Sequence, residues 1–191
     1  MTSRFIRTIF LASLFVVASI SITAYAEGDK PATEQDTPIT RYAAEAEDLL
    51  RNLSEEQAKK YHLIRDTHGI IRSVQSVETI VGKAVKECKE KHGELGENID
   101  KRFTEWKLAV HPVVKSGEDR LEKLILLQDY AKPSDVKKHL KSFDAAAQYG
   151  EKLIDLKTAS DKKSCTALLK DMDKTQPNLI RLLRENIGLD K

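Results

Sequence analysis

Cysteines and histidines are the residues of this 191-residue chain best suited to chemistry, and their spacing argues against most of it. Covalent haem needs C-x-x-C-H, whereas Cys88 is followed by Lys-Glu-Lys-His with no second cysteine. Non-covalent haem needs an inward axial pair, and Met172 is the one methionine besides Met1. His68 lies near a predicted inward stripe, where a ligand role is conceivable but a hydrogen-bonded, partly buried histidine is the commoner finding. We therefore predict no cofactor.

The spacing of carboxylates and histidines does not match a metal site either. A di-metal carboxylate bundle repeats E-x-x-H on two helices, and no glutamate here stands three residues before a histidine. His62 and Asp66 have i, i+4 spacing and could share a zinc ion, but two ligands do not complete a site. Glu78 is the one carboxylate on a predicted inward stripe. The sequence predicts no metal site.

Patterns typical of nucleophilic catalysis are also missing. The chain has neither G-x-S-x-G nor a glycine-rich phosphate loop. Charged residues make up 32% of the chain, so carboxylate pairs arise by chance and indicate nothing. Pairs such as Glu55/Lys59 and Glu87/Lys91 have the spacing that supports a solvated helix. We expect that the protein is not an enzyme and has no catalytic residue.

The chain that carries these residues is predicted to be helical nearly throughout from about residue 40. Apolar residues recur there at helical spacing, and no segment alternates with period two. A short helix over 40–51 precedes Ser54-Glu55-Glu56-Gln57, an S-x-x-Q capping box that begins a long helix. We expect that helix to end near Lys91, because His92-Gly93 is typical of a C-terminal stop.

Three further helices are predicted. The first, over about 98–131, contains Pro112, which removes a backbone hydrogen bond and therefore predicts a kink. Ser134 and Ser160 are the predicted N-caps of the last two helices. Pro177 is expected to bend or restart the last one.

Each of the four longer helices has one apolar stripe. In the first, the inward positions repeat at the 3.5-residue period of a bundle seam. The four stripes are Ile64, Thr67, Ile71, Val74, Glu78, Val81, Val85 and Cys88; Ile99, Phe103, Trp106, Val110, Val113, Gly117, Leu121 and Leu124; Val136, Leu140, Phe143, Ala147, Gly150 and Ile154; and Cys165, Leu168, Leu169, Met172, Leu179, Ile180, Leu182, Leu183 and Ile187.

Short connections between these helices make sequential helices antiparallel neighbours. We therefore predict an all-α fold: an elongated up-down-up-down four-helix bundle. The 40–51 helix is expected on the side or at one end of the bundle. Residues 40–191 form a single domain in this prediction.

The two cysteines are expected to form a disulfide. Cys88 lies about one turn from the end of the first long helix, and Cys165 about one turn into the last. The predicted topology brings those two helix ends to the same pole, and both residues lie on inward stripes. Closing a loop of about 77 residues stabilises a fold by about 4 kcal/mol in the chain-entropy model. A redox or metal-binding role for the pair is disfavoured because there is no C-x-x-C, and free buried thiols are the remaining alternative.

Residues 1–26 have the three parts of an export signal. Arg4 and Arg7 precede an uncharged, mostly apolar run, which ends in Ala24-Tyr25-Ala26 before Glu27. The run is shorter than the ~20 residues of a spanning helix, which argues against an uncleaved anchor. We predict cleavage between Ala26 and Glu27, a disordered leader over 27–39, and a periplasmic protein with no stable membrane insertion after cleavage.

Removing the signal also removes the net charge. The chain has 32 basic and 30 acidic residues, and Arg4 and Arg7 account for the difference. A neutral protein with both signs interspersed has no electrostatic footprint for nucleic acid or for an anionic membrane. Neither is therefore an expected partner.

Leu53-Ser54-Glu55-Glu56-Gln57 resembles the L-T-x-x-Q motif of the small periplasmic chaperone and stress-sensor family that includes Spy and CpxP. The resemblance implies a helical, non-enzymatic protein that binds unfolded or envelope proteins. This chain has the motif once where that family has two copies, and the capping box accounts for it, so we assign no family.

These observations favour a non-enzymatic periplasmic bundle that acts through protein contacts, as an adaptor, envelope-stress or chaperone-like factor. The expected partner is another envelope protein or a second copy of the chain. The alternative is a bundle that binds a small ligand or haem, with a site near the predicted Pro112 kink.

Overall fold

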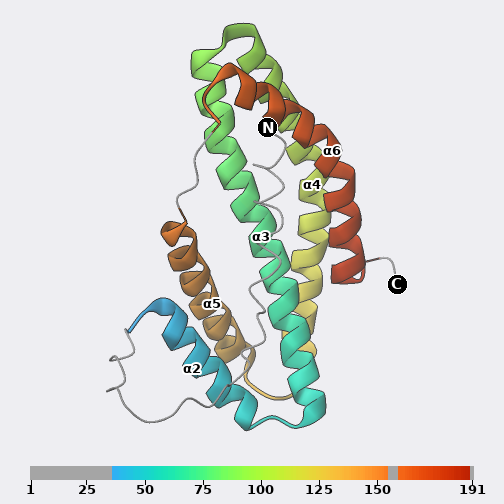
Figure 1. Ribbon diagram of the computed structural model, residues 1–191. Helices are drawn as coiled ribbons and strands as arrows, with labels where there is room; N and C mark the ends of the chain where they lie inside the picture. Colours follow the sequence, from blue (N-terminus) through green and yellow to red (C-terminus); the bar gives the residue numbers. More distant parts are fainter. Residues whose placement is uncertain (1–35, 155–158, 190–191) are drawn as a thin grey trace, which may run out of the picture. The chain divides into compact units, whose positions relative to one another are not determined.

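A computed structural model describes residues 36–154 and 159–189 of the chain. Those residues form five α-helices and no strand, so the predicted all-α class is confirmed (Figure 1). The helices are α2 (Pro38–Arg51), α3 (Glu55–Lys91), α4 (Gly93–Leu127), α5 (Pro133–Leu153) and α6 (Lys162–Ile187). The predicted signal, its cleavage site at Ala26 and Glu27, and leader residues 27–35 lie outside the described residues. None of the described helices is long and apolar enough to cross a membrane.

Helices α3 and α4 form a long antiparallel hairpin. Their register is marked by ion pairs at three heights: Lys89–Asp100 at 2.7 Å, Glu78–His111 at 2.9 Å and Lys60–Asp129 at 3.1 Å. The turn is tight, since His92 is both the C-cap of α3 and the N-cap of α4.

Two glycines allow this tight turn. Gly93 has φ +45°, a left-handed conformation that an L side chain adopts at a cost. One turn later, a Cβ on Gly96 would lie 2.5 Å from Cα of Lys89, so the two backbones meet where only hydrogen fits. The hairpin therefore needs glycine at these two positions for different reasons.

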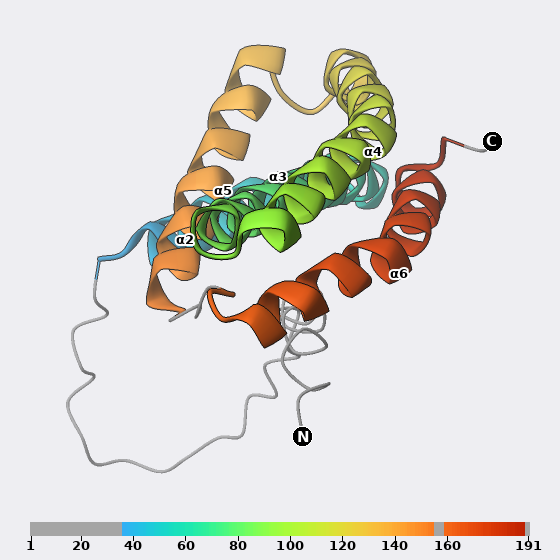
Figure 2. The ribbon, with the colours of Figure 1, turned by 90° about the horizontal axis from the view of Figure 1, so that it is seen from above.

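Helices α5 and α6 cover opposite ends of the hairpin. Near the turn, Cys165 of α6 meets Cys88, and α6 then follows α4 until Ile187 reaches Gly117. At the other end, α5 lies along the first half of α3, with Phe143 against Gly69. The directions alternate as predicted, but α5 packs mainly on α2 and α6 mainly on α4, so the two do not close a full-length bundle together (Figures 1 and 2).

The core follows the predicted stripes. Ile64, Ile99, Val110, Leu183 and Ile187 are each 2% exposed or less. The last residue of the α5 stripe was wrongly placed: Ile154 is 55% exposed, because α5 ends at Leu153. Leu182 of α6 is likewise 42% exposed.

Two predicted N-caps were wrong by one or two residues. Helix α5 begins at Pro133 with Lys132 as N-cap, because the fixed φ of proline suits the first helical position and Ser134 is then inside the helix. Helix α6 is capped by Asp161 and not by Ser160. The Asp161 carboxylate accepts hydrogen bonds from the amides of Lys163 and Ser164 at 2.9 Å each.

Three further predictions concern the start of α2 and the two prolines within helices. Helix α2 begins at Pro38, two residues before the predicted start at 40, with Thr37 as its N-cap. Both Pro112 and Pro177 lie inside continuous helices. Helix α6 changes direction along its length, as proline in a helix interior favours (Figures 1 and 2).

Candidate functional site

The end of the molecule at the α3–α4 turn is closed by the predicted disulfide, which the structure confirms. Cys88 and Cys165 are bonded with their Cα atoms 5.8 Å apart, and both are 0% exposed. Nearby, Nε2 of His92 donates a hydrogen bond to the carbonyl of Ser160 at 3.0 Å, which ties the start of α6 to the same turn. The described residues include no cluster of three or more side chains that could hold a metal ion. The disulfide and the His92–Ser160 hydrogen bond therefore stabilise this end.

The opposite end contains a hollow of about 420 Å³ between α2, α3, α5 and the α4–α5 link. Its floor is apolar, and carboxylates, a lysine, a histidine and two tyrosines complete its wall. The lining residues are Glu45, Asp48, Leu49, Asn52, Tyr61, Ile64, Tyr130, Ala131, Asp135, Val136, Lys138, His139 and Leu140.

An aromatic cluster forms one wall of this hollow and joins α2 and α5 to α3. The Tyr61 hydroxyl lies 3.0 Å from Nε2 of His139. The Tyr42 ring stacks on His139 at a centroid distance of 5.1 Å. Tyr130 meets Tyr61 edge to face at 6.4 Å. Tyr61 was not among the predicted stripe residues, although it is 2% exposed and lies one turn before Ile64, the first of them.

Burial sets the charge of His139. Its Nδ1 lies 3.7 Å from a Glu45 carboxylate oxygen, which favours the protonated ring, yet burial lowers the pKa of His139 because desolvation outweighs that attraction. In the neutral ring, Nδ1–H faces the carboxylate, which only accepts. Nε2 then accepts a hydrogen bond from the Tyr61 hydroxyl.

The order Glu45–His139–Tyr61 is that of a carboxylate–histidine–hydroxyl relay, but its surroundings favour binding over nucleophilic catalysis. A phenol nucleophile needs access and a lowered pKa. Tyr61 is buried, and burial raises the pKa of its neighbour Tyr130 to about 12. The pKa of Tyr42 is raised for the same reason. The phenols of Tyr42 and Tyr130 therefore stay protonated.

Two phenols of this aromatic cluster lack hydrogen-bond partners. The hydroxyl oxygens of Tyr42 and Tyr130 are buried and make no hydrogen bond in the described structure. A buried polar group without a partner costs about 1–3 kcal/mol. Buried polar groups without a hydrogen-bond partner are unusual in a protein core, and Tyr130 lines the hollow.

Polar contacts between α3, α4 and α5 hold this end together. Nε2 of His68 donates to Asp144 at 2.8 Å, and Arg72 forms an ion pair with Glu151 at 3.2 Å. The expectation that His68 is a partly buried, hydrogen-bonded side chain is confirmed. Lys137 joins α5 to Glu122 of α4 at 2.7 Å.

The remaining sequence candidates form ordinary surface pairs. Asp66 pairs with Arg65 at 2.7 Å. Glu78 pairs with His111 at 2.9 Å beside Pro112, the region where a ligand site was the alternative. The hollow described above does not include Pro112.

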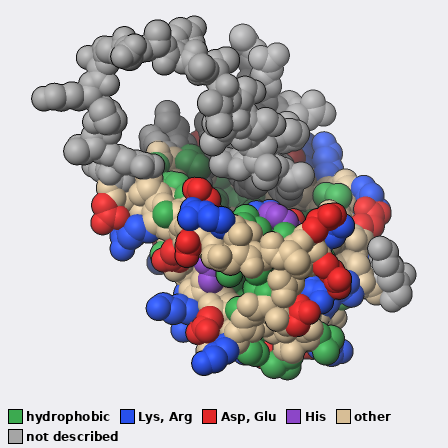
Figure 3. All heavy atoms as spheres, turned by 90° about the horizontal axis from the view of Figure 1, so that it is seen from below, with side chains coloured by type: hydrophobic (Ala, Val, Ile, Leu, Met, Phe, Trp, Pro, Cys, Tyr) green, Lys and Arg blue, Asp and Glu red, His purple; other side chains and the backbone are tan. Residues whose placement is uncertain are grey.

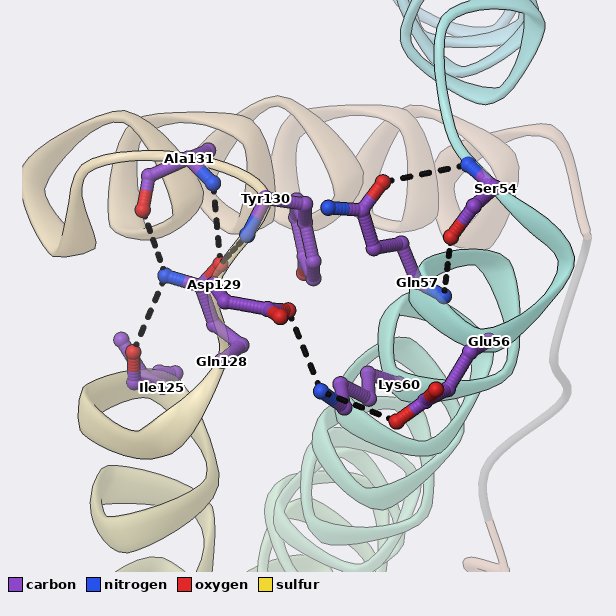
Figure 4. A network of polar contacts seen from close by, with 9 residues as sticks. All are labelled: Ser54, Glu56, Gln57, Lys60, Ile125, Gln128, Asp129, Tyr130 and Ala131. Atoms are coloured by element: carbon purple, nitrogen blue, oxygen red, sulfur yellow. Dashed lines mark hydrogen bonds and ion pairs between the residues drawn. The ribbon is translucent and has the colours of Figure 1, made fainter.

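A glutamine that no sequence motif indicates shapes the α4–α5 link (Figure 4). The Gln128 side chain is buried, donates to the carbonyls of Ile125 and Ala131, and accepts from the amides of Tyr130 and Ala131. Four hydrogen bonds to one side chain fix the link where Tyr130 enters the hollow wall. Figure 4 also shows the predicted capping box, in which the Ser54 hydroxyl and the Gln57 side chain bond each other's backbone amides.

Beside this link, α4 ends with exposed leucines. Leu126 is 60% and Leu127 80% exposed, although Ile125 is buried. Successive residues of an α-helix are about 100° apart, so Leu127 points away from the core side that Ile125 faces. The hairpin register places Leu63 of α3, 41% exposed, at the height of Leu126. Figure 3 views the helices from this end and shows hydrophobic side chains among charged ones.

Comparisons of the chain with family models, with curated proteins and with solved structures found no match.

Proposed function

We propose that this protein is an exported, non-enzymatic helical bundle that acts by binding another envelope protein. The proposal places the contact surface at the leucine edge, which we define as Leu126 and Leu127 at the end of α4. The mature protein would work in the periplasm after cleavage between Ala26 and Glu27.

One observation carries the proposal: two adjacent leucines, 60% and 80% exposed, end α4, whose one other exposed large apolar side chain among the described residues is the isolated Leu108, 71% exposed. Full burial of a leucine side chain is worth about 1.5–3 kcal/mol. Single exposed leucines are common on protein surfaces. Here, however, the pair directly precedes a link that the four hydrogen bonds of Gln128 hold in place, which makes it a pre-organised surface.

The disulfide supports export. A buried bond between Cys88 and Cys165 forms and persists in oxidising compartments such as the periplasm. The export step has its own test: N-terminal sequencing of the protein isolated from a periplasmic fraction should begin at Glu27. A chain that retains Met1 would contradict export by cleavage.

Site-specific photo-cross-linking tests the binding surface. A benzophenone amino acid replaces Leu127, and in a second variant it replaces Glu105, an exposed residue elsewhere on α4. The expected result is an adduct with an envelope protein from position 127 and none from position 105. Leu126→Lys should reduce the adduct, because burying an ammonium group opposes the contact.

Equal capture from both positions, or no capture from position 127, would contradict the proposal. Capture of a second copy alone would make the partner another molecule of this chain. Circular dichroism of each variant checks that its helices remain folded.

A further inference from the structure

We infer that the hollow between α2, α3 and α5 binds an organic cation, namely a protonated amine carried on an apolar body. This inference does not depend on the leucine edge, because it is drawn from different residues. Three properties of the hollow support it: an apolar floor, a surplus of carboxylates at the rim and an aromatic wall.

The floor accepts an apolar body. Ile64, Val136 and Leu140 are each 5% exposed or less, and Leu49 completes this part of the lining. The volume of about 420 Å³ is within the usual range of small-molecule sites, which is roughly 300–1,000 Å³. An aliphatic or aromatic body of modest size would lose its hydration there.

The rim selects for positive charge. Glu45, Asp48 and Asp135 bring three carboxylates to the lining, against the single ammonium of Lys138. These carboxylates are weakly engaged: Asp48 lies 3.8 Å from Arg51, Glu45 lies 3.7 Å from His139, and Asp135 forms no ion pair with any described residue. Their charge therefore remains available to a ligand.

The wall suits an ammonium group. The rings of Tyr61 and Tyr130 belong to the lining, and an aromatic face attracts a cation by about 0.5–2 kcal/mol. The Tyr130 hydroxyl is buried without a hydrogen-bond partner, so it accepts a hydrogen bond from an N–H group only after a small shift of the Tyr130 side chain. A protonated amine would thus supply what this wall lacks.

A second hollow nearby shows the contrast. It has a volume of about 320 Å³ and is also lined by Leu140, but most of its charged or titratable side chains pair with one another. His68 bonds Asp144 at 2.8 Å, and Lys137 pairs with Glu122 at 2.7 Å. Only the first hollow combines uncompensated carboxylates with an unpartnered phenol.

Three probes with the same apolar body and different charge test the inference. Octylammonium, octanol and octanoate are titrated into the mature, disulfide-bonded protein at pH 7, with heat of binding and the NMR signals of the tyrosine rings as readouts. We expect octylammonium to bind at least about tenfold more tightly than octanoate, with shifts at Tyr61 and Tyr130. An acetylated Leu-Lys-Leu amide distinguishes a peptide side chain from a free amine as the source of the ammonium group.

The matched variants are Asp48→Asn/Asp135→Asn at the rim and Glu94→Gln/Glu105→Gln on α4 near the disulfide end. Asp135 and Glu94 both lie in the first turn of a helix, so the pairs are comparable in structure. An exposed charge about 4 Å from a ligand is worth about fivefold in affinity, and the rim variant should therefore weaken octylammonium binding about tenfold or more. The control pair should change it less than twofold.

Equal affinities for octylammonium and octanoate would overturn the inference, as would an unchanged affinity in the rim variant. Failure of every probe to bind at millimolar concentration would also overturn it. Tighter binding of the peptide than of octylammonium would identify the natural source as a protein segment, and the reverse order as a small amine.

Discussion

The two ends of the α3–α4 hairpin are built from different interactions. At the turn, α6 packs against the hairpin through fully buried apolar residues and the Cys88–Cys165 bond. At the opposite end, α2 and α5 are held by an aromatic cluster, ion pairs and one buried glutamine, around a hollow. Both unpartnered buried phenols lie at this second end.

This difference indicates a division of tasks within one fold. Apolar packing and a covalent bond fix the turn end, where Arg102 of α4 also forms an ion pair with Asp173 of α6. At the opposite end, buried hydroxyls in the wall lack partners and the leucine edge is exposed. We expect this end to have lower intrinsic stability and to be stabilised more by a bound partner. We therefore expect changes at the disulfide end to alter the stability of the whole fold. Changes at the α2–α5 end should alter binding and local opening.

The largest effect should follow from loss of the disulfide. The variant Cys88→Ala/Cys165→Ala removes a bond that closes a loop between residues 77 apart and should lower the free energy of unfolding by about 4 kcal/mol. Urea unfolding followed by the fluorescence of Trp106, the single tryptophan, measures it. A wild-type protein treated with reductant serves as the control, and an unchanged midpoint in both would refute the stabilising role.

A pair of leucine truncations compares the packing of the two ends. Leu183→Ala in α6 should cost about 3 kcal/mol, because the 1% exposed side chain leaves a cavity in close-packed surroundings. Leu140→Ala in α5 should cost less, about 2 kcal/mol, because this side chain already borders two hollows and leaves fewer contacts unfilled. Equal losses in urea unfolding would remove the distinction between the ends.

A pH-dependent contribution is expected from His139 at the α2–α5 end. Burial lowers its pKa in the fold, so the unfolded chain binds a proton more readily than the native state. The contribution of neutral His139 is therefore complete above about pH 6.5 and is lost as the pH falls below that value. Glu45 opposes this shift only in part, and Tyr61 and Tyr42 are the other groups that face the ring.

The variant His139→Gln isolates that contribution, since the amide oxygen can still accept from the Tyr61 hydroxyl. The difference in unfolding free energy between wild type and variant should shrink as the pH is lowered from 7 to 5. A difference that grows over this range would mean that the folded state favours the protonated ring, contrary to the account.

Two tyrosine variants should have small effects of opposite sign. Tyr130→Phe removes a buried hydroxyl without a partner and should leave stability unchanged or raise it by up to about 1 kcal/mol. Tyr61→Phe removes the hydrogen bond to His139 and should cost about 1 kcal/mol. Thermal unfolding of both variants measures the contrast. A loss in Tyr130→Phe equal to that in Tyr61→Phe would show that the Tyr130 hydroxyl already has a partner.

The sequence was sufficient to predict the architecture because its information is local and periodic. The apolar stripes, the Ser54–Gln57 capping box and the alternation of helix directions were all confirmed, and the register of the stripes placed Cys88 beside Cys165. The N-cap at Ser134 was wrong because Pro133 favours the first helical position. The N-cap at Ser160 was wrong because Asp161 forms a capping box with Ser164, which Ser160 is one residue too early to form.

The candidate site could not be predicted in the same way, because its parts are brought together by tertiary packing. Tyr42, Tyr61, Tyr130 and His139 lie on three helices and a link, and no spacing in the sequence relates them. The sequence also has no periodic pattern from which to predict that α5 covers only part of the hairpin. Which end a helix covers depends on the lengths of the helices and not on the positions of their stripes. The structural role of Gln128 is apparent only from the backbone groups to which its side chain forms hydrogen bonds.

Native-state hydrogen exchange tests the division between the two ends most directly. Amides in the middle of α5 and α2 should exchange through local opening, at free energies below that of global unfolding. Buried amides of α4 and α6 around Val110 and Leu183 should exchange only with global unfolding. Adding octylammonium should slow exchange in α2 and α5 selectively. Uniform protection across all five helices, or faster exchange at the disulfide end, would contradict the account.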